Sequence, residues 1–250
     1  MRSKIIIDIE TVIDDTILPN HSIEHDGWPD PIAWKIIAIG IISVENLGLN
    51  TLMVPSIRYL CCGTGNEKQL LEKFWEIIET KNPQIISWNG RSFDMQVLLH
   101  RAFKFNIPVT AWFQTGDKWN SYRQRYSENW HLDLMDVMAA FGASTRSKQD
   151  LISKAIGLAG KVDVSGKDVD ELYKDGKIKE IADYCETDVL NLYAIYLRWT
   201  FISGAITKIS YKDSCDNFKL FLEKESEKKP HLSEFLNKSS SFFEDVMLVQ

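Results

Sequence analysis

The chain contains several short runs of β-branched and other apolar residues, which are typical of buried strands. Such runs predict strands at 4–9, 36–44 and, more weakly, 51–57. A further strand is predicted at 84–88, where Asn89-Gly90 ends it, and 131–133 is a short extended piece. No helical pattern separates the first three runs, so we expect them to form a strand meander.

Apolar residues recur at helical spacing elsewhere in the chain. They predict helices at 66–80, 93–105, 134–141, 148–156 and, most clearly, from 178 to about 201. Asn82-Pro83 stops the first of these helices, and Ser92 is the expected N-cap of the second. In the last helix the expected buried positions are Ile181, Leu192, Ile195 and Leu197. A meander followed by alternating strand and helix indicates an α/β fold.

The composition fits one substantial hydrophobic core and excludes a disordered or fibrous protein, because 44% of the 250 residues are apolar. The four cysteines form no Cys-x-x-Cys pair, so neither a disulfide framework nor a zinc site is predicted. No signal-peptide core or membrane-length apolar run is present, and we expect a soluble cytoplasmic protein. The net charge of −6 argues against a protein that coats nucleic acid, but not against an enzyme that uses divalent cations.

Three segments of the chain carry carboxylates that are candidates for metal binding or catalysis. Asp8 and Glu10 are two residues apart at the end of the first strand, so their side chains project from the same face. Asp94 lies in the first turn of a predicted helix, where the helix dipole favours an ionised carboxylate. Tyr184 and Asp188 are one helical turn apart on a common face. Each signal is weak by itself, since the chain has 35 acidic residues and each position also has an ordinary structural explanation.

The three segments together resemble the DEDD exonucleases of the tyrosine subclass. The motifs are Asp8-Ile9-Glu10-Thr11, Trp88-Asn89-x-x-x-Phe93-Asp94 and Tyr184-Cys185-x-x-Asp188, in the order that the family uses. The chain is most similar to the proofreading exonuclease domain of family B DNA polymerases and to free-standing predicted exonucleases related to it. Gly160-Lys161, Gly166 and the stretch 173–198 resemble the latter group. Asp183 stands where the sister subclass has its catalytic histidine, which argues against that subclass.

This resemblance implies a ribonuclease H-like fold, with a mixed five-stranded sheet flanked by helices. It also implies that Asp8, Glu10, Asp94 and Asp188 are the metal ligands and that Tyr184 positions the attacking water. Two Mg²⁺ or Mn²⁺ ions suit ligands that are all oxygen, whereas zinc prefers nitrogen or sulfur ligands. The implied reaction is 3′–5′ hydrolysis of nucleic acid to nucleoside 5′-monophosphates.

Other residues near the motifs have two interpretations each. Thr11, Asn89 and Phe93 resemble substrate-contacting residues, although Phe93 could equally be core packing. The aromatic and basic segment 110–130 suits a single strand or is a partly buried connecting loop. His131, Asp133 and Asp136 suggest a metal site, but their spacing favours structural roles. Cys185 has no partnering base, and we interpret it as packing.

The expected organisation is an exonuclease domain over 1–204 and a helical extension over 205–250, whose run 219–229 suggests a solvated helix. Three roles for the extension stay open: it docks on the domain, mediates a dimer or binds a replication partner. Single-stranded DNA or DNA 3′ ends are the favoured substrate, and an RNA-trimming enzyme is the alternative. A non-catalytic nucleic-acid or protein-binding module and a nucleotide phosphatase are the competing functions.

Overall fold

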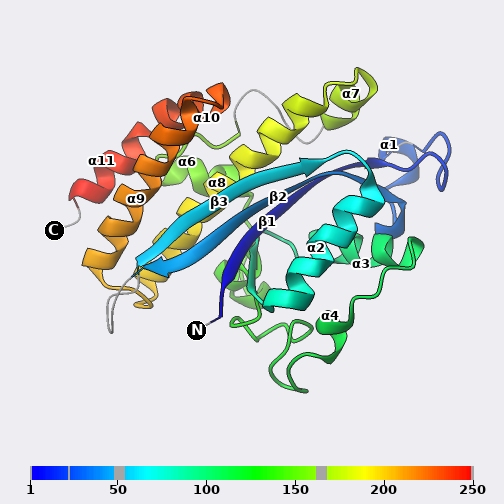
Figure 1. The fold of residues 1–250 in the computed structure, drawn as a ribbon, viewed down its shortest axis with the longest axis horizontal. Helices are drawn as coiled ribbons and strands as arrows, with labels where there is room; N and C mark the ends of the chain where they lie inside the picture. The colour runs from blue at the N-terminus through cyan, green and yellow to red at the C-terminus, as the bar shows by residue number, and fades with distance from the viewer. Residues whose placement is uncertain (1, 22, 48–53, 162–167, 249–250) are drawn as a thin grey trace.

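The computed structural model describes residues 2–21, 23–47, 54–161 and 168–248. A mixed five-stranded sheet has the order β3-β2-β1-β4-β5, in which β1, β2 and β3 are antiparallel neighbours and β4 and β5 run parallel to β1 (Figure 1). The strands are β1 (Lys4–Ile13), β2 (Trp34–Leu47), β3 (Val54–Thr64), β4 (Gln84–Ser87) and β5 (His131–Asp133). The predicted α/β class, the meander and the mixed five-stranded sheet are confirmed.

The third strand is displaced along the sequence from its prediction. Residues 51–53 of the predicted strand lie outside the described residues, and β3 continues to Thr64, seven residues beyond the predicted end at Ile57. The strand is longer because it pairs with β2 from Leu47 back to Ala38. Pairing with a long neighbour therefore outweighs the weak local strand signal after Ile57.

Helices cover both faces of the sheet (Figure 1). They are α1 (Ile23–Asp26), α2 (Glu67–Lys81), α3 (Asp94–Lys104), α4 (Thr110–Gln114), α5 (Leu134–Met138), α6 (Gln149–Ala155), α7 (Val169–Lys174), α8 (Ile178–Ile202), α9 (Lys208–Ser226), α10 (Pro230–Lys238) and α11 (Ser240–Leu248). The helices predicted near α2, α3, α5, α6 and α8 are confirmed. The short helices α1, α4 and α7 were not predicted, because four to six residues are too few for a helical period to be recognised.

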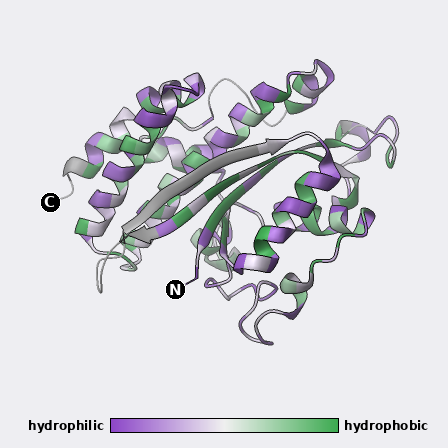
Figure 2. Cartoon of the chain, viewed as in Figure 1, coloured by the Kyte–Doolittle hydropathy of each residue, from purple (hydrophilic) through white to green (hydrophobic). Residues whose placement is uncertain are grey.

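The alternation of side chains along β1 divides the core into two layers. Ile5, Ile7 and Ile9 pack with α2 and α3 on one face, whereas Ile6 packs with α8 on the other. The four residues predicted to be buried in α8 are at most 2% exposed, which confirms that prediction. Figure 2 shows β1 and β2 as largely hydrophobic, while α2 alternates between hydrophobic and hydrophilic residues.

The C-terminal helices pack on the α8 side of the same core. Tyr211, Phe218 and Leu222 of α9 and Phe235 of α10 are buried there. The prediction of a solvated helix over 219–229 is wrong in part, since Leu222 is buried and α9 ends at Ser226. Among the described residues, no helix is long and apolar enough to span a bilayer.

Candidate active site

A cleft of about 660 Å³ opens where β1, α3 and α8 meet. Seven of the residues predicted for the site line it, namely Asp8, Glu10, Asn89, Phe93, Asp94, Tyr184 and Asp188. Thr11 is not among the lining residues, and lies beside a β-bulge between β1 and β2. The segment that contains Gly166 lies outside the described residues.

The first two carboxylates reach the cleft from within β1, which continues to Ile13, four residues beyond its predicted end at Ile9. Asp8 and Glu10 lie on the α8 face of the strand, and Glu10 is 7% exposed. Burial raises the pKa of Asp8 well above its usual range, and the charges of Glu10, Asp94 and Asp188 raise it further. The charges of three other acidic groups therefore disfavour ionisation of Asp8. Such a concentration of carboxylates is typical of a cation-binding site.

Asp94 enters the cleft from the first turn of α3. The predicted cap is wrong, because Phe93 rather than Ser92 occupies the N-cap position, and Gly90 supplies a backbone carbonyl to the N–H of Met95 at 2.8 Å. Burial raises the pKa of Asp94 to about 7, although hydrogen bonds with its own backbone and that of Ile9 lower it. The helix terminus thus places a buried carboxyl beside β1.

The turn that precedes Asp94 is held by a carboxylate from another strand. Asp133, at the end of β5, accepts hydrogen bonds from the backbone N–H groups of Asn89 and Arg91, both at 2.9 Å. Asn89 adopts a left-handed backbone conformation with φ of 63°, which asparagine tolerates better than most residues. This anchoring role was not predicted, because the two segments are more than 40 residues apart in the sequence.

His131, Asp133 and Asp136 have structural partners, as their spacing predicted. The imidazole of His131 is hydrogen-bonded to Ser87 Oγ at 2.7 Å, and Asp136 pairs with both nitrogens of the Arg125 fork at 2.7 and 2.6 Å. Burial and the nearby Arg91 lower the pKa of His131 well below its usual range, so the ring is neutral at pH 7.

Tyr184 and Asp188 enter from one face of α8, and both are buried. Burial raises the pKa of the Tyr184 phenol, and the charges of Asp188, Glu10 and Asp8 raise it further, so the hydroxyl stays protonated. Burial also raises the pKa of Asp188, while Lys161 and a hydrogen bond from Tyr184 lower it. The phenol therefore remains a hydrogen-bond donor beside the carboxylate.

Lys161 is one of the cations that line the cleft and was not assigned a role from the sequence. Its ammonium group donates a hydrogen bond to the Tyr184 hydroxyl and lies 3.8 Å from Asp188 Oδ2. Its backbone N–H donates to Asp150 Oδ1 at 2.8 Å, and Asn191 donates to the carbonyl of the preceding Gly160 at 3.0 Å. The Gly160-Lys161 pair was the only indication, and nothing in it specified contact with Tyr184.

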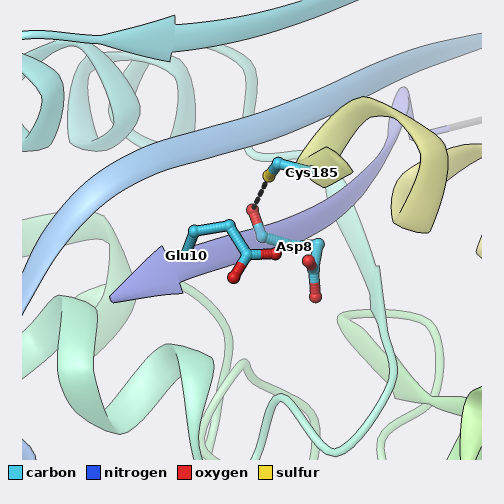
Figure 3. A group of neighbouring side chains, drawn as sticks. All are labelled: Asp8, Glu10 and Cys185. Carbon is cyan, nitrogen blue, oxygen red and sulfur yellow. Dashed lines mark hydrogen bonds between the residues drawn. The ribbon is translucent and has the colours of Figure 1, made fainter. Parts of the chain in front are cut away.

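Cys185 lies close to the carboxylates but bonds to the backbone. Its ligand atom and those of Asp8 and Glu10 are all within 4.8 Å of one another. Figure 3 shows the thiol directed at the backbone oxygen of Asp8, to which it donates at 3.7 Å. This contact agrees with the interpretation of Cys185 as packing, and leaves a donor set of oxygen atoms.

Gly40 allows α8 to approach the sheet closely enough to complete the cleft. It is the register partner of Asp8, and a Cβ there would lie 2.9 Å from Cys185 Sγ and 3.1 Å from Val189 Cγ1. Contacts below 3.0 Å force one of the partners to move. The absence of a side chain at this position thus sets the distance between Asp8 and the residues of α8.

Gly40→Ala is therefore expected to displace α8, to lower the free energy of unfolding by about 1–3 kcal/mol and to slow any activity of the cleft. Urea unfolding and a rate assay measure the two effects. Gly63→Ala is the matched control, because its Cβ would meet only the flexible end of Leu70, at 2.9 Å. Equal losses in both variants, or none at Gly40, would contradict this account of the packing.

A protein family and a solved structure are similar to this chain. A family described as predicted 3′–5′ exonucleases related to the exonuclease domain of PolB matches residues 30–239. That span includes Asp94, Tyr184 and Asp188 and begins after β1. A search of curated proteins found no match.

One solved structure with a similar fold is the family B DNA polymerase from the hyperthermophilic archaeon Pyrobaculum calidifontis. The TM-score is 0.51 at 14% identity, over 90% of this chain and 29% of the polymerase chain. At this identity the likeness concerns the fold, which is ribonuclease H-like. Because the family match covers most of the sequence, the chain belongs to the predicted 3′–5′ exonucleases related to the exonuclease domain of PolB.

Proposed function

We propose that this chain is a metal-dependent 3′–5′ exonuclease that acts on single-stranded DNA or DNA 3′ ends and releases nucleoside 5′-monophosphates. The observation that carries the proposal is the meeting of Asp8, Glu10, Asp94 and Asp188 in one cleft. These carboxylates come from three segments far apart in the sequence. Their crowding is unfavourable without cations, as the raised pKa of Asp8 indicates.

The four carboxylates suit divalent ions that prefer oxygen ligands, and we propose that they hold two Mg²⁺ or Mn²⁺ ions. The chemistry that such a pair supplies when bound is activation of a water molecule and stabilisation of the leaving 3′ oxygen. The chain contributes the ligand positions, which are fixed by the middle of β1, the first turn of α3 and the middle of α8.

Tyr184 is proposed to orient the attacking water through its hydroxyl group. Since its raised pKa keeps the phenol protonated, it acts as a hydrogen-bonding group and not as a base. Lys161 donates to the same hydroxyl, which directs the phenolic proton toward Asp188. The pair therefore limits the orientations that the Tyr184 hydroxyl adopts.

Asn89 and Phe93, which line the cleft, and Thr11, which follows Glu10 in β1, are proposed to contact the terminal nucleotide. Phe93 is partly buried and lies 5.8 Å from Trp34 and 6.0 Å from Trp28, measured between ring centroids. Trp28 is 68% exposed, so the group presents an aromatic surface at the edge of the cleft. This packing supports stacking as well as a structural role for Phe93.

The exonuclease domain is proposed to span residues 1–204, with 205–250 as an extension docked on it. Lys229 and His231 both bind the carboxylate of Glu186 in α8, at 2.7 and 2.9 Å. Glu186 lies two residues before Asp188. Of the roles considered for the extension, docking has the most support from these contacts.

The purified chain is expected to convert 5′-labelled single-stranded DNA into a ladder that shortens from the 3′ end in the presence of Mg²⁺ or Mn²⁺. A chelator should stop the reaction, because without divalent cations the negative charges of the carboxylates and of the phosphate that approaches them repel one another. Gel analysis of single-stranded DNA, duplex DNA and matched RNA ranks the substrates, and faster digestion of RNA would favour an exoribonuclease.

Two outcomes would contradict the proposed function and indicate a different one. Hydrolysis of free nucleotides while oligomers stay intact would indicate a nucleotide phosphatase. Binding of oligomers that are not shortened with any metal would indicate a non-catalytic binding module.

A further inference from the structure

A second cavity of about 500 Å³ lies beside the catalytic cleft. Arg146 lines both cavities, so they meet at this side chain. They are also lined by neighbouring residues of two helices, which are Asp94 and Met95 in α3 and Met135 and Asp136 in α5. A ligand that leaves the cleft past Arg146 therefore enters the second cavity.

The second cavity is rich in arginine, although the chain as a whole carries a net charge of −6. Four guanidinium groups line it, from Arg91, Arg123, Arg125 and Arg146, together with a single carboxylate, Asp136. His131 also lines the cavity, but it is buried and neutral at pH 7 and so adds no charge. The cavity thus has a local positive charge next to the acidic cleft.

Two of the four arginines are held by the protein itself. Arg91 donates to the carbonyl oxygens of His131 and Tyr122, at 2.6 and 3.3 Å. Arg125 is paired with Asp136 and also donates to the carbonyl of Phe141 at 2.8 Å. These two side chains shape the wall of the cavity.

Arg123 and Arg146 are the two arginines that are available to a ligand. Arg123 is exposed, and its guanidinium carbon lies 5.8 Å from the centre of the Phe113 ring. Arg146 forms an ion pair with Asp136, in which Nη2 and Oδ1 are 3.6 Å apart and not hydrogen-bonded, and its side chain is 46% exposed. Within the described ranges, neither guanidinium group donates a hydrogen bond.

Exposed aromatic rings belong to the same segment. Phe113 is 50% exposed and Tyr126 is 71% exposed, and the Tyr126 ring packs on Phe141 with centroids 4.8 Å apart. Trp112, Tyr122 and Trp130 are buried and anchor the segment to the core. A fixed loop that presents arginines and exposed rings is suited to the phosphates and bases of a single strand.

We propose that the second cavity binds the phosphodiester backbone of the substrate strand on the 5′ side of the nucleotide in the cleft, with Arg123 and Arg146 as the phosphate contacts. The assignment rests on the proposed exonuclease function, since the 3′ end must lie at the carboxylates. Substrates too short to reach beyond Arg146 lose these contacts. Strand length and salt are therefore the variables that report on the cavity.

The test compares wild type, Arg123→Ala, the Arg123→Ala/Arg146→Ala double variant and the matched control Lys224→Ala, which removes an exposed cation from α9. One readout is the ratio of kcat/KM for a single-stranded DNA 16-mer to that for a dinucleotide. The other is the salt dependence of 16-mer binding in a chelator, followed by fluorescence anisotropy. Lys224→Ala should match wild type in both.

For the double variant we expect the 16-mer advantage to fall about tenfold, and the slope of log affinity against log salt to become shallower by about 0.7 for each lost phosphate contact. An unchanged ratio and slope would overturn the assignment, even if the wild type cleaves DNA. If the wild type binds the 16-mer without cleaving it, the proposed function fails, and the salt slopes still decide whether the cavity binds phosphates. Equal competition by a glutamate-rich peptide of the same charge would overturn a nucleic-acid site.

Discussion

Asp8→Asn is expected to slow nucleic-acid cleavage by about 10³-fold or more, because the loss of a ligand removes several kcal/mol of charge stabilisation from the transition state. Asp8 lies among Glu10, Asp94 and Asp188, where it is one of the four proposed ligands. Asp188→Asn should behave in the same way. Single-turnover digestion of labelled DNA measures the loss, and wild-type rates in both variants would refute the proposed ligand set.

The same substitution should make the metal-free protein more stable at neutral pH. Burial and three acidic neighbours raise the pKa of Asp8 above its unfolded value of about 3.9. Stability is therefore greatest when the carboxyl is protonated, and falls as pH rises from the unfolded pKa through the folded one. Asparagine cannot ionise, so the gain should be present near pH 7 and absent below about pH 4.

Thermal unfolding in a chelator, followed from acidic to neutral pH, tests this second effect. The control is Asp175→Asn, because the Asp175 side chain is 63% exposed and does not line the cleft. Wild-type stability equal to or above that of Asp8→Asn at pH 7 would show that the carboxylates of the cleft do not repel one another as inferred.

Local sequence patterns were sufficient for most of the fold. The isoleucines of β1 form a β-branched run and the apolar face of α8 follows a helical period. The bounds of α8 were predicted closely, whereas β1 continues four residues beyond its predicted end. The spacing of Asp8 and Glu10, and of Tyr184 and Asp188, is also local, so which side chains share a face could be read from the sequence. That β1 and α8 lie together was inferred only from the family resemblance.

The features that were missed depend on contacts between distant segments. Asp133 anchors the Asn89 turn across the sheet, and Lys161 meets Tyr184 through a bend that Asn191 holds in place. Neither residue occupies a distinctive sequence pattern. Likewise, the segment 110–130 could not be divided by sequence into buried anchors and exposed rings, because both kinds of position are aromatic.

A buried ionic network was also not predicted, and it joins α2, α3 and the loop after β1. Arg101 is fully buried and donates to both carboxylate oxygens of Glu67, at 2.6 and 2.5 Å, and to the carbonyl of Ile32 at 2.8 Å. It also pairs with Asp14 at 2.8 Å. The network holds the chain just after β1 and just before β2, and so supports the strand that carries Asp8 and Glu10.

Arg101→Met is expected to lower the free energy of unfolding by about 3–5 kcal/mol, since it leaves Glu67 and Asp14 buried without their common cation. This is a large part of the total stability of an ordinary domain, about 5–15 kcal/mol. Urea unfolding at pH 7 measures the loss. Lys104→Met is the matched control, because Lys104 pairs with the same Asp14 from a side chain that is 29% exposed, and should cost about 1 kcal/mol. Similar losses in the two variants would mean that the burial of Arg101 adds nothing to the strength of its ion pairs. Partial recovery of stability in Arg101→Met/Glu67→Gln would identify the unpaired Glu67 as the source of the instability.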